Sequence, residues 1–207
     1  MRRKHMDIIE LVDEVVKLEW DAFDKVENEG GRADCQEDWN TFQIMRKSQY
    51  LTWNEEMLLQ FKKDFIAANE RGWNLITEKY ARMMESTAKD RYDALKDKLP
   101  VISEEKKKIM EEIIRIQVNW MEEFATRYPK LAGNARSIHT SEDNMFNTSY
   151  ETYLRGELGT YSDEMLELYG RFIVGLVKEQ KNLSEMTMRN TTLLYGYQSL
   201  DDAEQRL

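Results

Sequence analysis

The sequence predicts an all-α fold, a single globular multi-helix domain of six to eight helices that spans residues 1–207. Only two prolines and nine glycines interrupt the 207 residues. The segments between them are long and rich in Met, Leu, Glu and Lys, which favours helices. Hydrophobic residues make up 41% and charged residues 33% of the chain. This is the balance of a folded globular protein that is long enough to bury a core, not of a disordered chain.

Apolar residues recur at helical spacing in each of these segments. We expect helices over residues 7–26, 34–53, 54–98 (one helix, or two that meet near Gly72), 103–128, 141–157, 162–177 and 184–195, with a serine at the start of each of the last four. Residues 1–5 are expected to form a tail, and residues 27–34 and 129–141 the main loops. The acidic end of the chain is expected to fray.

Charge, cysteine content and hydropathy exclude several classes of function. The formal net charge of −9 at pH 7 argues against nucleic acid as a partner, because phosphate binding requires a basic surface. A single cysteine excludes an internal disulfide and any cysteine-rich zinc or iron–sulfur site. No apolar run has the length of a membrane span or the form of a signal peptide. We therefore expect a cytoplasmic protein with no nucleic-acid or membrane partner.

The sequence lacks the common metal-binding and hydrolase motifs. A carboxylate-bridged di-iron bundle uses Glu-x-x-His pairs on facing helices, and no glutamate lies three positions before His139. The zinc motif HExxH and the nucleophile motif GxSxG are also absent. The sequence therefore predicts no metal site and no cofactor.

Charged side chains lie on two otherwise apolar helix faces. At about 100° per residue, Arg46 and Gln49 fall among the aromatic residues of the 34–53 helix. Glu19 falls near the middle of the apolar face of the 7–26 helix. A buried charge must be paired, because leaving it unpaired costs several kcal/mol. Two explanations stay open: a structural Glu19–Arg46 salt bridge, or a site in which one or both groups contact a polar ligand.

The residues around these charges predict a polar-aromatic cavity built by residues 19–53. Its walls would be Trp20, Trp39, Tyr50 and Trp53, and its polar anchors Glu19, Arg46 and Gln49. Small-molecule sites commonly combine an apolar pocket with a few polar groups. Arg46 would hold a substrate carboxylate, and Gln49 and Asn69 would orient it. Arg32 belongs to a glycine-containing turn that either folds over the ligand and contacts it or only connects two helices.

Glu19, Cys35 and His139 are the candidate catalytic residues. With Asp34 as N-cap, Cys35 would lie in the first turn of a helix, where the helix dipole lowers the pKa of a thiol. The alternative for Cys35 is a small buried hydrophobic residue. His139, in the 129–141 loop, is either a general acid or base or an exposed loop residue. A Cys35–His139 nucleophile–base pair is compatible with the sequence, which leaves their separation in space open.

The stretch from Trp20 to Tyr50 also resembles a known family. It reads W-x-x-F-D-x-V-x-N-E-G-G-R-A-x-C-Q-x-D-W-x-T-F-x-I-M-R-x-S-Q-Y, and here the chain is similar to bacterial domain-of-unknown-function family 4125. The resemblance implies a helical bacterial protein with no assigned reaction. It also implies an association with nucleotidyltransferase-like domains, some of whose small helical partners are ribonucleases with an Arg-x4–6-His motif. Only two residues separate Arg136 from His139, so the ribonuclease role is not carried over.

Two functional hypotheses follow. The leading one is an enzyme that acts on a small polar, carboxylate-bearing metabolite in the 19–53 cavity. The alternative is a non-catalytic interaction module, a helical partner of a nucleotidyltransferase-like domain or of a second copy, in which Glu19–Arg46 is a structural pair. A closed cavity would favour the enzyme. An acidic, exposed apolar patch on the 150–157 helix would favour the module.

Overall fold

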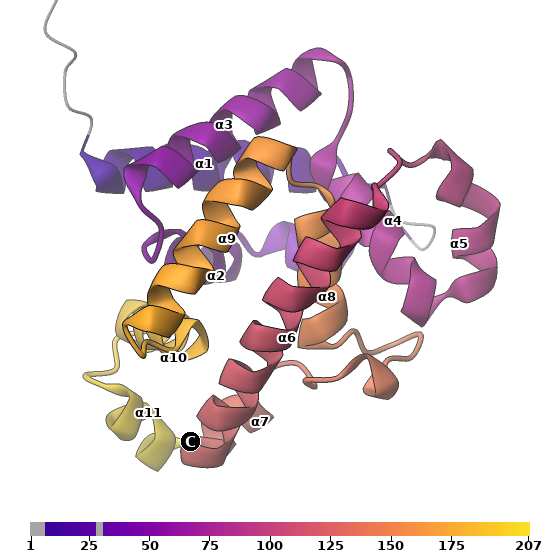
Figure 1. Ribbon diagram of the computed structural model, residues 1–207. Helices are drawn as coiled ribbons and strands as arrows, with labels where there is room; N and C mark the ends of the chain where they lie inside the picture. The colour runs from indigo at the N-terminus through magenta and orange to yellow at the C-terminus, as the bar shows by residue number, and fades with distance from the viewer. Residues whose placement is uncertain (1–6, 28–30) are drawn as a thin grey trace, which may run out of the picture.

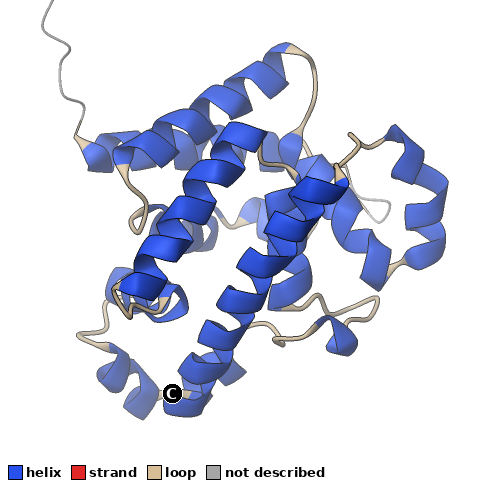
Figure 2. Ribbon diagram, viewed as in Figure 1, coloured by secondary structure: helices blue, strands red, loops and turns tan. Residues whose placement is uncertain are grey.

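The computed structural model describes residues 7–27 and 31–207, and within them it contains helices and no β-strand (Figure 2). The expected all-α fold is confirmed. The expected number of helices is wrong, because the described residues form eleven α-helices and three short 3-10 helices. The tail 1–5 and residues 28–30 of the 27–34 loop lie outside the described residues. None of the helices in the described part of the chain is long and apolar enough to cross a membrane.

The elements follow one another without long gaps. The first half of the chain forms α1 (Ile8–Phe23), η1 (Asp34–Glu37), α2 (Trp39–Tyr50), α3 (Glu55–Glu70), α4 (Leu75–Thr87), α5 (Lys89–Leu95) and η2 (Lys96–Lys98). The second half forms α6 (Glu104–Arg127), α7 (Pro129–Gly133), η3 (Thr140–Glu142), α8 (Tyr150–Gly159), α9 (Asp163–Lys178), α10 (Leu183–Leu194) and α11 (Leu200–Arg206).

A glycine, a helix cap and a turn divide the expected 54–98 segment into three α-helices, α3, α4 and α5. In the expected 54–98 segment, Gly72 takes a positive φ of 70°, which glycine adopts at little cost and which ends α3. Asn74 then caps α4, because its side-chain oxygen accepts hydrogen bonds from the backbone N–H groups of Ile76 and Thr77. The chain turns again at Ala88, and α5 begins at Lys89.

Three expected helix starts are wrong. Residues 34–37 form a 3-10 turn, and α2 begins only after Asp38, whose carboxylate accepts the N–H of Thr41 at 2.9 Å. Ser149, not Ser141, caps α8 by accepting the N–H of Thr152 at 3.2 Å. Asn182, not Ser184, caps α10. The starts at Ser103 and Ser162 are confirmed. A polar side chain that can cap recurs too often in this chain for spacing alone to choose among them.

Two regions expected to be irregular contain helices. The 129–141 loop includes α7, with Pro129 at its first position, where proline is favoured. The chain end forms α11 instead of fraying, because Leu200 and Ala203 are buried. The residues of this second, smaller core are Met121, Phe124, Leu131, Leu200 and Ala203. It holds α7 and α11 against the end of α6 near the C-terminus (Figure 1).

The main core lies between helices from both halves of the chain. α6 and α9 run side by side and in the same direction (Figure 1): Lys106 at the start of α6 pairs with Asp163 at the start of α9, and the Asn182 amide donates to the Trp120 carbonyl at the other end. α8 lies beside both α4 and α6, and α2 lies against α1 and α10. α5 and η2 contain no buried residue and project from the body of the molecule as an arm (Figure 1). We call residues 88–101 the arm.

Candidate functional site

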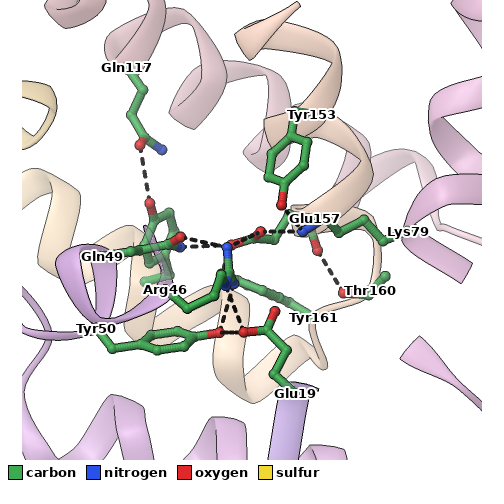
Figure 3. A network of polar contacts seen from close by, with 11 residues as sticks. Glu19, Arg46, Gln49, Tyr50, Lys79, Gln117, Tyr153, Glu157, Thr160 and Tyr161 are labelled. Atoms are coloured by element: carbon green, nitrogen blue, oxygen red, sulfur yellow. Dashed lines mark hydrogen bonds and ion pairs between the residues drawn. The ribbon is translucent and has the colours of Figure 1, made fainter. Parts of the chain in front are cut away.

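A buried network of charged and polar side chains joins four helices at the centre of the molecule. α1 contributes Glu19, α2 contributes Arg46, Gln49 and Tyr50, α4 contributes Lys79, and α8 with the turn after it contributes Tyr153, Glu157 and Tyr161 (Figure 3). Glu19, Arg46, Lys79 and Glu157 are exposed by 2%, 6%, 3% and 5%. Two acids and two bases therefore lie in the interior with almost no access to water. We call these eight residues the Arg46 network.

The guanidinium of Arg46 is surrounded by acceptors. Its Nε donates to Glu19 Oε2 at 2.6 Å, and its Nη1 donates to Gln49 Oε1 at 2.9 Å and to Glu157 Oε2 at 3.2 Å. Its Nη2 donates to the Tyr50 hydroxyl at 2.7 Å, and that hydroxyl in turn donates to Glu19 Oε2 at 2.8 Å. The expected Glu19–Arg46 pair is confirmed.

Glu157 is the second acceptor at the centre of the network. Its Oε1 accepts from Gln49 Nε2 at 2.7 Å and from the Tyr161 hydroxyl at 3.2 Å. Its Oε2 accepts from Lys79 Nζ at 3.0 Å as well as from Arg46. Lys79 Nζ also donates to the Tyr153 hydroxyl at 2.6 Å. Each charged group thus has a partner of opposite charge, and the four charges cancel.

Burial and neighbouring charges hold Glu157, Arg46 and Tyr50 in one protonation state each. Burial raises the pKa of Glu157, but the positive charges of Arg46 and Lys79 outweigh it and hold that pKa well below the usual range. Burial lowers the pKa of Arg46, and the charges of Glu157 and Glu19 more than reverse this, so Arg46 stays protonated. Burial raises the pKa of Tyr50, which keeps its proton. Groups held so firmly charged or neutral are poor proton carriers near neutral pH.

The expected aromatic walls belong to two separate clusters. Trp20 packs against Trp39 and Phe42, with ring centroids 5.2 and 5.0 Å apart, and Trp39 is partly exposed. Trp53 packs edge-on against Tyr50 at 4.9 Å and continues into the main core. Tyr50 therefore both joins the Arg46 network and seals it from the apolar side.

The other expected site residues lie on the surface. Arg32 is a structural clamp, because it pairs with Asp24 at 2.6 Å and with Glu37 at 2.7 Å. Asn69, expected within a buried stripe, is exposed in the last turn of α3. Cys35 is exposed in η1 and not in the first turn of an α-helix, so the structure contradicts both the expected dipole position and the buried alternative.

His139 is also on the surface. Its Nε2 lies 3.1 Å from Glu122 Oε1 on α6, and both side chains are about half exposed. The partner that the structure gives this imidazole is therefore a carboxylate of α6 and not the thiol of Cys35. Arg136, from the same connection, lies over the ring of Tyr153 with its guanidinium carbon 4.8 Å from the ring centroid.

A cleft of about 740 Å³ opens between the arm and helices α4, α6 and α8. We call it the arm cleft. Its lining residues are Arg82, Glu85, Ser86, Tyr92, Lys96, Asp97, Leu99, Pro100, Val101, Ile102, Lys107, Met110, Glu111, Thr140, Thr152, Arg155 and Gly156. None of the described residues between 19 and 53 is among them. α8 separates the cleft from the Arg46 network, since Thr152 and Gly156 face the cleft and Glu157 faces the network.

Hydroxyl groups and one carboxylate organise the inner wall of the arm cleft. Asp143 Oδ2 accepts from Ser86 Oγ and from Thr152 Oγ1, both at 2.5 Å. Thr152 Oγ1 lies 3.0 Å from Thr140 Oγ1. Burial raises the pKa of Asp143, but the hydrogen bonds from Ser86 and Thr152 outweigh it and lower that pKa. Asp143 is therefore an ionised acceptor that fixes the orientation of the hydroxyls.

Arg155 stands beside these hydroxyls. Its Nε and Nη2 donate to the two carboxylate oxygens of Glu111 at 2.7 and 2.9 Å, and its Nη1 donates to Thr140 Oγ1 at 3.1 Å. The hydrogen bonds to Glu111 raise the pKa of Arg155. Its Nη2 also donates to Glu151 Oε1 at 2.8 Å, so the inner wall holds a guanidinium that two carboxylates fix next to ordered hydroxyls.

The family model described as "Protein of unknown function (DUF4125)" matches residues 9–205, nearly the whole chain. The chain belongs to this family. The resemblance read from the stretch between Trp20 and Tyr50 is thereby confirmed. No curated protein and no solved structure matches the chain.

In this DUF4125 chain, the network contains four charged or polar residues that the sequence did not single out as site residues: Lys79, Tyr153, Glu157 and Tyr161. A signal for Glu157 exists, because it shares a helix face with Tyr150 and Tyr153 at spacings of seven and four. Lys79 is three positions from the buried Ile76, yet a lysine at such a place more often extends its amine to water. The arm cleft could not be found from the sequence, because its walls come from separate segments between Arg82 and Gly156.

Proposed function

We propose that this protein binds a small polar anion, such as a carboxylate-bearing or phosphorylated metabolite, in the arm cleft. The observation that carries the proposal is the cleft itself. Its volume of about 740 Å³ falls within the range of roughly 300–1,000 Å³ that small-molecule sites occupy. Ordered hydroxyls and a fixed guanidinium on one wall are the kind of polar groups that orient a ligand in such a site.

The charge of the lining supports an anionic ligand. Four basic residues line the cleft, Arg82, Lys96, Lys107 and Arg155, against three acidic ones, Glu85, Asp97 and Glu111. The lining residues alone therefore carry a formal charge of +1 in a chain whose net charge is −9. Behind them Glu78 pairs with Arg82 and Glu151 with Arg155, which leaves Lys96 and Lys107 as the basic groups most available to a ligand. At the rim, Lys96 pairs with Asp93 and Lys107 with Glu104, both across exposed i,i+3 contacts. Such pairs contribute little, so both amines can turn toward a bound anion at small cost.

The Arg46 network is a weaker place for the same ligand. A substrate carboxylate at Arg46 would have to replace Glu19 or Glu157, which already accept its N–H groups. The displaced carboxylate would then be buried without a partner, which is costly. We assign the network to holding α1, α2, α4 and α8 together, and the ligand to the arm cleft.

We propose that the cleft binds its ligand and do not propose a chemical reaction there. The described residues that line the cleft include no cysteine or histidine, and Asp143, whose pKa is lowered, is a weak base. The interaction-module hypothesis gains no support from α8. An exposed apolar patch on that helix would have favoured the module, but the helix is buried at six of its positions: Thr152, Leu154, Gly156, Glu157, Leu158 and Gly159.

A thermal-shift screen with dicarboxylates, sugar phosphates and nucleotides tests the proposal, because a ligand that binds the folded state raises its melting temperature. The matched variants are Lys107→Glu at the rim of the cleft and Lys108→Glu on the next position of α6, which does not line the cleft. We expect an anion that stabilises the wild type and the Lys108→Glu variant but not the Lys107→Glu variant. A ligand whose effect is equal in both variants, or a screen without any stabilising anion, contradicts the proposal.

A further inference from the structure

The outer face of α9 is not covered by any other element in the described part of the chain. Val174 and Val177 on this face are exposed by 49% and 48%, and Ile109 on the neighbouring turn of α6 by 44%. A groove of about 760 Å³ between α6 and α9 is lined by Ile109 and Val174, together with Leu166. The opposite face of α9 is buried, with Met165, Tyr169 and Ile173 exposed by 2% or less.

Charges on this face are segregated along the helix. Asp163 and Glu167 lie toward the start of α9, and Arg171 and Lys178 toward its end, all of them lining the groove. At about 100° per residue, Glu167, Arg171, Val174 and Lys178 fall on one narrow stripe. Reversing the direction of such a stripe places acids opposite bases, so the face is complementary to an antiparallel copy of itself. Glu167 also pairs with Arg171 within the helix, but an exposed i,i+4 pair is weak enough to rearrange.

The residue numbers determine which positions of the two antiparallel helices lie opposite each other. A two-fold axis at the level between Phe172 and Ile173 places Glu167 of each copy opposite Lys178 of the other. The same axis places Gly170 of each copy at the level of Gly175 of the other, with the two glycines on opposite flanks of the stripe. A Cβ at Gly175 would meet no atom within 4 Å and one at Gly170 only Ile113 Cδ1 at 3.8 Å, so packing within one chain explains neither glycine. Glycine is also a weaker helix former than alanine inside a helix.

We propose that this protein forms a symmetric dimer through antiparallel packing of α9 against α9 of a second copy. Val174 lies near the centre of the contact, at the level of Arg171 of the other copy, and Ile109 and Val177 enlarge its apolar part. Gly170 and Gly175 flank the contact on either side and leave room there for side chains of the other copy. Two Glu167–Lys178 ion pairs, one on each side of the axis, set the antiparallel direction. The dimer is independent of the proposed function, because no α9 residue lines the arm cleft.

Two charge-reversal variants, measured alone and as a mixture, test whether the dimer forms. Sedimentation velocity of the wild type at low ionic strength should give twice the chain mass of 24.7 kDa. Glu167→Lys places two lysines opposite each other twice per dimer, and Lys178→Glu does the same with two glutamates. Each variant alone should dissociate at least about tenfold more readily, because opposed like charges disfavour association. An equal mixture of the two should recover the dimer. In the mixed dimer the introduced lysine faces the introduced glutamate on one side of the axis, and native Lys178 faces native Glu167 on the other.

Two further variants complete the test. Val174→Glu should give a folded monomer, and Lys98→Glu, which changes an exposed lysine of the arm that does not line the groove, should dimerise like the wild type. Circular dichroism and the melting temperature check that each variant is folded. A wild type that stays monomeric at every concentration overturns the proposal. So does a dimer that the single variants leave intact, or one that the mixture fails to restore.

Discussion

Replacing Arg46 by methionine should destabilise the protein strongly. Among the described residues, the variant leaves Glu19 with the Tyr50 hydroxyl as its hydrogen-bond donor, in a position that is 2% exposed. The four charges of the network would change from neutral to −1. Removing one partner of a buried ion pair costs about 3–5 kcal/mol, mostly because the other charge is left uncompensated. At about 2–4 °C per kcal/mol for a chain of this size, the melting temperature should fall by roughly 6–20 °C.

A second substitution separates this explanation from a simple loss of contacts. Glu19→Leu in the Arg46→Met background removes the uncompensated charge, and Lys79 and Glu157 remain as a neutral pair. The double variant should therefore be more stable than Arg46→Met alone, since well-packed apolar groups often replace a buried ion pair without loss. Urea unfolding followed by circular dichroism measures the free energy of unfolding of the wild type, the Arg46→Met and Glu19→Leu single variants and the double variant. A loss below about 1 kcal/mol in Arg46→Met, or a double variant that loses the sum of the two single losses, would refute the reasoning.

Three further predictions concern the same region. Arg46→Lys keeps the charge but loses the planar fork of N–H groups, so we expect the free energy of unfolding to fall by about 1–3 kcal/mol. Ligand-induced stabilisation should stay unchanged. If it disappears in a thermal-shift assay, Arg46 belongs to the binding site. The pKa of Glu157 is lowered in the folded state, so its contribution to stability is complete above its ordinary value of 4.5 and is lost as the pH falls below it. Glu157→Gln should hence be less stable than the wild type at pH 7. Below pH 4.5, its free energy of unfolding, measured by urea unfolding at a series of pH values, should fall less steeply with decreasing pH. A fall as steep as that of the wild type would contradict this. Gly156→Ala should lower the melting temperature, because the new Cβ would lie 2.7 Å from Met83 Cγ and 2.9 Å from the Lys79 carbonyl oxygen; an unchanged value would show that α8 can shift.

The sequence predicts the helical class and the buried Arg46–Glu19 pair for one physical reason. Helical periodicity shows which side of a helix faces inward, and a charge on that side must have a partner. The same reasoning was wrong for Asn69, which is exposed in the last turn of α3 although the preceding Ala68 is buried, because it lies about 100° around the helix from Ala68 and outside the buried stripe. The choice of Asp34 as N-cap was wrong for Cys35, because this residue lies within the 3-10 turn η1 and Asp38 caps α2.

What periodicity does not supply is the identity of long-range neighbours. Glu157 contacts Arg46 across 111 positions of the chain, and Lys79 contacts Glu157 across 78. Each helix face alone is compatible with many partners, so the sequence indicates that Arg46 needs acceptors without indicating which helix brings the second one. The arm cleft is even harder to predict from the sequence, because its shape depends on where the arm projects.

The span of the Arg46 network bears on how the chain reaches its native state. During synthesis at about 5–20 residues per second, Glu157 is made roughly 5–20 s after Arg46, given the 111 residues between them. For that interval the N-terminal helices hold a guanidinium with one of its two carboxylates missing. Nascent α1, α2 and α4 therefore cannot close their interior until α8 arrives, and docking of α8 should be a late, cooperative step. A chain stopped before α8 should behave as an expanded helical intermediate, open to proteases and chaperones.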